Sequence, residues 1–220
     1  MSHLLLWLAA AVAPAGILHP APGAARAFVR VEVDEQGVIQ SMHFREGTGE
    51  RLQAILRERV QSWRFDPATA GGRPARAQTT ITIDLKAGAD GQSLEIAAIS
   101  AGVAMSYVSV PQYVPGPKKM QGNVVLRCRV TADGRCHDIS VEQATAPEKL
   151  QKSAMKSLAD WRFETEVVSG VAVESWVLIP FCFSLHPVGE PVPECRAGEA
   201  RAVAGTDPPR LKLRDPLAQR

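Results

Sequence analysis

Apolar and polar residues alternate in the middle of the second half of the chain as they do in a β-hairpin. Every second residue over 124–130 is apolar or cysteine, which predicts a strand with one buried face. Asp133-Gly134 follows, and this dipeptide favours a tight turn because it tolerates positive φ angles. The alternation resumes over 136–141, so this stretch predicts two antiparallel strands.

A helical pattern follows the hairpin. Thr145 and Glu148 have the spacing of a capping box, in which both side chains satisfy free N–H groups at a helix start. Apolar residues then recur at helical spacing as far as Trp161, and alternation over 177–185 predicts a third strand. The unit is therefore ββαβ. Trp161 and Phe163 continue the helical stripe, so we expect them in the core rather than at a partner surface.

Residues 28–86 repeat this order of elements in a weaker form. Alternating valines begin the unit, Gln36-Gly37 takes the place of the turn, and a helical stripe ends in Trp63-Arg64-Phe65. That tripeptide matches Trp161-Arg162-Phe163 at a separation of 98 residues. We expect Trp63 and Phe65 to lie in a core of their own.

The second unit resembles the C-terminal domain of TonB-type energy transducers. The resemblance rests on the alternating strand from Gly122, on Asp133-Gly134, on the tryptophan-arginine-phenylalanine helix end and on Pro180 to Leu185. It implies an α+β fold with two tandem ββαβ domains, each an antiparallel three-stranded sheet with one helix packed on it. The resemblance includes the segment Pro111 to Pro115 upstream of the second unit. The first copy is degenerate and lacks such a segment.

The expected organisation follows from these patterns. Domains are expected over 28–86 and 122–186. Residues 87–121 are expected to form a linker, and 187–220 form a tail rich in proline and charge that is mobile beyond Cys195.

Residues 1–27 predict an export signal, because an apolar run is followed by the small-x-small site Ala25-Arg26-Ala27. An uncleaved inner-membrane anchor is the alternative, although the apolar run Leu4–Leu18 is shorter than the roughly 20 residues that a span needs. The chain is therefore expected in the periplasm.

Composition and motifs argue against several classes of function. The 25 basic and 23 acidic residues nearly cancel, and aromatic residues make up only 5%, so no nucleic-acid partner is expected. The chain contains no nucleophile, zinc-protease or phosphate-loop motif, and we expect neither an enzyme nor a cofactor.

Four cysteines follow an export signal, which favours two disulfides. Cys128 and Cys136 flank the hairpin and replace positions that are apolar in the resembled family, so Cys128–Cys136 is the preferred pair, leaving Cys182 for Cys195. Four cysteines allow three pairings, and all remain open at this point. A metal site drawn from Cys136, His137, Cys182 and His186 is the alternative, but its spacing matches no zinc pattern and we expect no metal.

The resemblance also implies a function. TonB-type domains bind the short N-terminal box of outer-membrane transporters by strand addition, which uses a free sheet edge. Carried over, this predicts a non-enzymatic periplasmic module that binds a protein or peptide, such as a TonB-dependent outer-membrane transporter. The alternatives are a membrane-anchored transducer of transmembrane transport and an envelope protein that forms a homodimer through sheet edges. The residues implicated in partner binding are Pro111, Gln112, Tyr113, Val173, Val177, Ile179 and Phe181.

Overall fold

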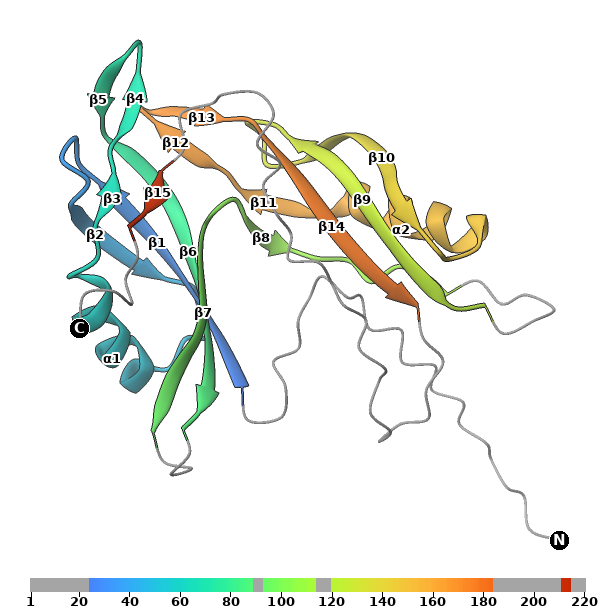
Figure 1. Ribbon diagram of the computed structural model, residues 1–220, viewed down its shortest axis with the longest axis horizontal. Helices are drawn as coiled ribbons and strands as arrows, with labels where there is room; N and C mark the ends of the chain where they lie inside the picture. Colours follow the sequence, from blue (N-terminus) through green and yellow to red (C-terminus); the bar gives the residue numbers. More distant parts are fainter. Residues whose placement is uncertain (1–23, 89–92, 114–119, 184–210, 215–220) are drawn as a thin grey trace, which may run out of the picture.

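The computed structural model describes residues 24–88, 93–113, 120–183 and 211–214, which form two helix-bearing units side by side (Figure 1). The first unit contains β1 (Ala24–Val33), β2 (Ile39–Phe44), α1 (Glu50–Val60), β3 (Phe65–Asp66), β4 (Ala68–Ala70), β5 (Arg73–Ala75) and β6 (Ala77–Ala87). The connecting segment contains β7 (Leu94–Gly102) and β8 (Ala104–Tyr107). The second unit contains β9 (Gly122–Val130), β10 (Cys136–Ala144), α2 (Glu148–Asp160), β11 (Arg162–Glu164), β12 (Glu166–Val168), β13 (Val171–Val173) and β14 (Ser175–Phe183), and β15 (Lys212–Leu213) follows later in the chain.

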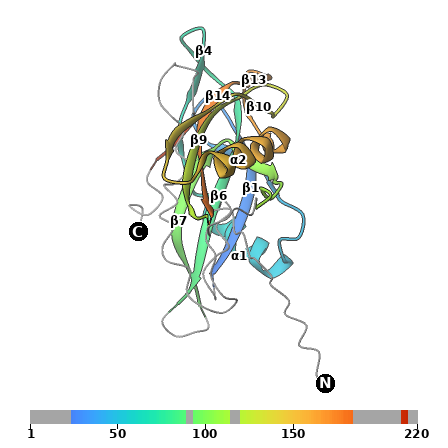
Figure 2. The same cartoon turned by 90° about the vertical axis from the view of Figure 1, so that its right-hand side faces the viewer.

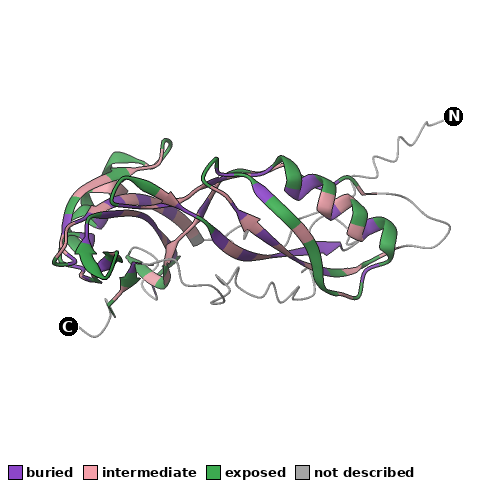
Figure 3. Cartoon of the chain, turned by 90° about the horizontal axis from the view of Figure 1, so that it is seen from above, coloured by how far each residue is buried: buried purple, intermediate pink, exposed green. Residues whose placement is uncertain are grey.

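The second unit is a three-stranded antiparallel sheet with α2 on one face (Figure 2). Its strand order is β10-β9-β14. The apolar stripe of α2 places Leu150, Ala154 and Leu158 on the sheet, where all three are fully buried, while the other side of the helix is exposed (Figure 3). Trp161 ends the helix at 0% exposure, and its ring centroid lies 5.4 Å from that of Phe181. The helix thus closes one continuous core.

The first unit has the same central strand order, β2-β1-β6, with Leu56 and Val60 of α1 buried against it. Trp63 and Phe65 are also buried. Its sheet has six strands, however, because the outer side of β6 pairs with β7 along most of its length and with β12 at Ala77. The α+β class is confirmed, but a three-stranded sheet was the wrong prediction for this unit. The outer edge of β6 carries backbone N–H and C=O groups that β1 does not pair, and β7 and β12 pair with this edge.

The hairpin turn and the end of the helix are joined in the same way in both units. The N–H of Phe163 donates to the carbonyl of Gly134 at 2.8 Å, and that of Phe65 donates to the carbonyl of Gly37 at 2.9 Å. Both glycines have positive φ angles, 72° and 81°. A Cβ atom added at Gly134 would lie 2.4 Å from the carbonyl oxygen of Phe163, so the close approach excludes any side chain.

The strand β1 begins before the predicted domain boundary. It starts at Ala24, and within it Nε of Arg26 lies 2.5 Å from Oδ1 of Asp84 while Ala27 is 1% exposed. The small-x-small site predicted for cleavage therefore lies inside a paired strand.

Residues 211–214 pack on the first unit. Lys212 and Leu213 pair with β3, and Arg214 forms an ion pair with Asp66 at 2.9 Å. Leu211 is 5% exposed in the core of the first unit. The prediction of a mobile tail beyond Cys195 is wrong for residues 211–214. Leu211 packs in the core of the first unit, and Lys212 and Leu213 pair with β3.

Substituting Gly134 tests the close approach of the turn to Phe163. Gly134→Ala should lower the free energy of unfolding by about 3 kcal/mol or more, because it adds a backbone clash to the cost of a positive φ angle. Gly170 is the matched control, with φ at 79° and nothing within 4 Å of an added Cβ. Gly170→Ala should cost only about 1 kcal/mol. Equal losses in urea denaturation would contradict the proposed contact.

The two hairpin turns should make stability sensitive to acid. The backbone N–H of Val38 lowers the pKa of Asp34 below its ordinary value of 3.8, and the Thr131 hydroxyl does the same to the pKa of Asp133. A carboxyl with a lowered folded-state pKa stabilises the fold above the ordinary value, and this contribution disappears as the pH falls through the lowered pKa.

The urea midpoint should therefore fall as the pH drops below about 3.8, and Asp34→Asn/Asp133→Asn should reduce that fall. Asp160→Asn, at the exposed end of α2, controls for the loss of one of the two negative charges. An unchanged pH profile in the double variant would show that the turns do not contribute.

Candidate functional site

The outer edge of β14 is the candidate site. β14 pairs with β9 along its whole length, from Ser175 opposite Val130 to Phe183 opposite Gly122. Within the described ranges, no other strand pairs with β14. Its second side therefore presents backbone donors and acceptors that an extended chain can bind.

Pro180 indicates which backbone groups face the open edge. Proline lacks an N–H, and an edge strand accommodates it where its nitrogen points away from the neighbouring strand. Because backbone groups alternate in direction along a strand, Trp176, Leu178 and Cys182 share the orientation of Pro180. An added strand would therefore meet the backbone groups of these three residues, with one donor missing at Pro180.

The predicted residues of β14 line the core. Val177, Ile179 and Phe181 lie buried beneath α2, so their side chains point to the helix-covered face of the sheet. By the same alternation, their backbone groups point to β9. Their even-numbered neighbours were missed, although Pro180 in an otherwise alternating strand was a usable signal.

Val173 lies elsewhere. It belongs to β13, which pairs with β12 as part of the first unit's sheet, and its side chain is in the first unit's core. The structure does not bring Val173 together with the other predicted residues.

Pro111, Gln112 and Tyr113 lie along α2. The Ser153 hydroxyl donates to the carbonyl of Gln112, and the Tyr113 hydroxyl donates to the carbonyl of Met120 at 3.2 Å. Pro111 is buried, whereas Gln112 is exposed. Just upstream, the carbonyl of Ser109 accepts from Nε1 of Trp161 at 2.9 Å and from the Ser157 hydroxyl at 2.7 Å. This segment is thus tied to the helix, and none of its hydrogen bonds within the described residues reaches β14.

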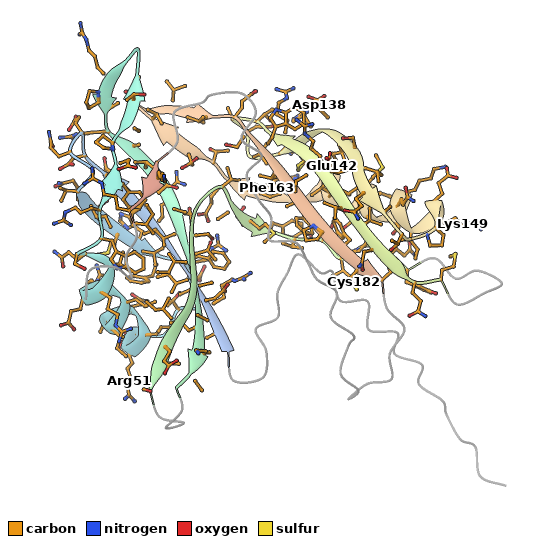
Figure 4. All side chains as sticks on the ribbon, viewed as in Figure 1. Arg51, Asp138, Glu142, Lys149, Phe163 and Cys182 are labelled. Atoms are coloured by element: carbon orange, nitrogen blue, oxygen red, sulfur yellow. A yellow bond between two sulfur atoms is a disulfide. The ribbon has the colours of Figure 1, made fainter. Side chains whose placement is uncertain are left out.

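A cleft of about 470 Å³ lies between the two units, near Phe163 (Figure 4). Two arginines in its lining contact groups on the second unit. Arg30 donates to the carbonyl of Thr165 at 2.7 Å, and Arg45 lies 3.0 Å from a carboxylate oxygen of Glu164 and 3.7 Å over the ring of Phe28. Burial lowers the pKa of Arg30, and Glu164 and Glu166 partly offset that effect. The contacts of Arg30 with Thr165 and of Arg45 with Glu164 join the two units.

The cysteines form disulfides. Cys128 and Cys136 are bonded, as predicted, with Cα atoms 5.5 Å apart. Cys182, near the end of β14 (Figure 4), is also disulfide-bonded, and its predicted partner Cys195 lies outside the described residues. His186 and Leu185 lie outside them too.

The described residues contain neither a candidate metal site nor a candidate membrane span. No group of three or more histidine, cysteine, aspartate or glutamate side chains there could hold a metal ion. Likewise, none of the helices in the described ranges is long and apolar enough to cross a membrane.

Comparison with known proteins identifies relatives of the second unit. Residues 117–185 match the family described as Gram-negative bacterial TonB protein C-terminal. Proteins named Protein TonB from two strains of Xanthomonas campestris pv. campestris are 28% identical over 89 residues, covering 40% of this chain and 40% of each relative. Protein tonB2 of Pseudomonas aeruginosa PAO1 is 32% identical over 66 residues, covering 30% of this chain and 24% of that protein.

A solved structure also matches part of the chain. The solution NMR structure of Pseudomonas aeruginosa TonB CTD is 24% identical, with a TM-score of 0.33, and the match covers 39% of this chain and 89% of that one. This chain spans less than half the length of the curated relatives it matches.

Removing Arg30 tests the contact between the units. Arg30→Met leaves the Thr165 carbonyl without its donor, and we expect the free energy of unfolding to fall by about 1–3 kcal/mol. Arg51→Met, on the exposed side of α1, is the control and should change stability by less than about 0.5 kcal/mol. Calorimetry of Arg30→Met should also show a broader transition, because the units then unfold less cooperatively. Identical transitions in the two variants would rule out a role for Arg30 in coupling.

Proposed function

We propose, from the membership of residues 117–185 in the TonB C-terminal domain family, that this chain is a non-enzymatic periplasmic protein that binds an extended protein segment at the edge of β14. The open edge is the observation that carries the proposal. Strand addition takes its affinity from backbone hydrogen bonds and its selectivity from side-chain contacts beside the edge.

The side chains beside this edge support a protein partner. On the sheet face opposite α2, Arg127 of β9 lies over the ring of Trp176, 4.3 Å from its centroid, next to the half-buried Leu178. Tryptophan and arginine are enriched at the energetic centres of protein interfaces. An added strand would place its own side chains next to this pair, which gives the edge a means of selecting its partner.

The proposed partner is the N-terminal segment of an outer-membrane transporter. This follows from the family of the second unit, whose relatives are named Protein TonB and Protein tonB2. We propose that the first unit is a degenerate copy of the second and serves as its support. A membrane-anchored transducer and a homodimer joined edge to edge are the alternatives, and the proline variant below tests the homodimer.

Amide shifts of isotope-labelled protein test the proposal. The probe is a synthetic peptide with the N-terminal sequence of a TonB-dependent outer-membrane transporter from the same genome. Addition of the peptide should shift the amide signals of Trp176, Leu178 and Cys182 more than the amide signals of the first unit. Shifts confined to α2 or to the first unit would contradict binding at β14.

A proline substitution makes the test specific for the backbone edge. Leu178→Pro removes a second outward donor, and the loss of one hydrogen bond of about 0.5–1.5 kcal/mol should weaken peptide binding about twofold to tenfold. Glu142→Pro is the matched control, because Glu142 lies at an irregularity in β10, the opposite edge strand. Equal effects of the two variants would argue against strand addition at β14. A concentration-dependent dimer that Leu178→Pro abolishes would instead favour the homodimer.

A further inference from the structure

The outer edge of β6 is the counterpart of the β14 edge in the first unit, and the chain itself fills it. β7 pairs antiparallel with β6 from Thr80 opposite Gly102 to Ala87 opposite Leu94. Ile99 lies opposite Ile83, on the face that packs against the core. β7 therefore occupies the position on the first unit that the proposed function assigns to a partner segment on the second.

Each residue of β14 has a counterpart in β6. From the helix onward, the units are related by a constant separation of 98 residues, so that Ile83 corresponds to Phe181 and Thr82 to Pro180. Both strands pair on their inner side with the first strand of their unit. Where Pro180 interrupts the donors of the β14 edge, Thr82 keeps its N–H and lies opposite Ser100 of β7. The β6 edge is thus the more complete acceptor of the two.

β7 is weakly held. None of its nine residues is buried, in contrast to β6, where most residues up to Leu85 are buried or partly buried. Only partial packing of Ile96, Ile99 and Ala101 ties it to the core. The ion pair between the strands, Lys86 with Glu95 at 3.1 Å, is half exposed and contributes little. A strand with few buried contacts belongs to the part of a fold that opens most readily.

We propose that the outer edge of β6 is a second strand-accepting site, occupied in this structure by β7, and that it binds an extended protein segment when β7 is released. The ligand class follows from β7 itself: an antiparallel segment with aliphatic side chains opposite Ile83 and Leu85 and a small side chain opposite Ile81. This inference uses the geometry of the first unit and does not require that β14 binds a partner.

A peptide supplied in trans tests the site. The probe is a fluorescent peptide with the sequence of residues 94–102, and the protein is the full chain. Ile99→Asp should detach β7 by placing a charge against the core, and this variant should bind the peptide at least tenfold more tightly than the wild type. Ser100→Asp is the matched control, because Ser100 is the exposed neighbour on the opposite face, and it should bind like the wild type. A peptide with the same residues in scrambled order should bind neither the wild type nor either variant.

The register of binding is tested by disulfide trapping. No described cysteine is free, so Thr82→Cys in the Ile99→Asp background adds a thiol on β6. With oxidised glutathione as the oxidant, a peptide with cysteine in place of Ser100 should form a mixed disulfide with it, whereas a peptide with cysteine in place of Ala97 should not. Peptide binding that Leu178→Pro abolishes would place the peptide at β14 and overturn the inference without affecting the proposed function.

Hydrogen exchange decides the matter if Ile99→Asp fails to fold. In the wild type, the amides of β7 should exchange at least tenfold faster than those of β1. Exchange of β7 as slow as that of β1 would show that β7 is a permanent part of the sheet. Absence of peptide binding to a folded Ile99→Asp variant would likewise overturn the inference.

Discussion

The strands that pair with the last strand of each unit determine how the two units are assembled. β6 accepts β1 on one side and both β7 and β12 on the other, whereas β14, within the described residues, accepts only β9. The contacts of β6 do more than complete one sheet. Through β12, they attach the second unit to the first, since β12 lies between α2 and β14 in the chain, with β11 before it and β13 after it.

The segment between helix and last strand therefore has two roles. In the first unit, β4 and β5 form a two-stranded sheet of their own among the described residues, while in the second unit β12 and β13 join the neighbouring sheet. Buried Glu166 accepts a hydrogen bond from Thr79 at 2.9 Å, which places a carboxylate at the junction. This junction joins the sheet of the first unit to the segment that leads toward β14.

Much of the local structure was predictable from particular residues. Alternation over β9, the Asp133-Gly134 turn and the stripe of α2 predicted their elements, because each depends on interactions among near neighbours. The Cys128–Cys136 pair was predictable since the two residues flank one hairpin. The pairing of β7 with β6, the docking of Leu211 and the position of Val173 were not, because each joins residues that lie on different units or far along the chain.

The sequence by itself determined the two ββαβ units, their helix-to-sheet cores and the turns that admit only glycine, since hydrophobic periodicity and backbone sterics act within a few residues. Only the tertiary structure decided which strand edges are filled. Backbone N–H and C=O groups are the same in every residue, so an edge carries almost no signature in the sequence. Its partner is chosen by which segment the packing of both cores brings within hydrogen-bonding distance.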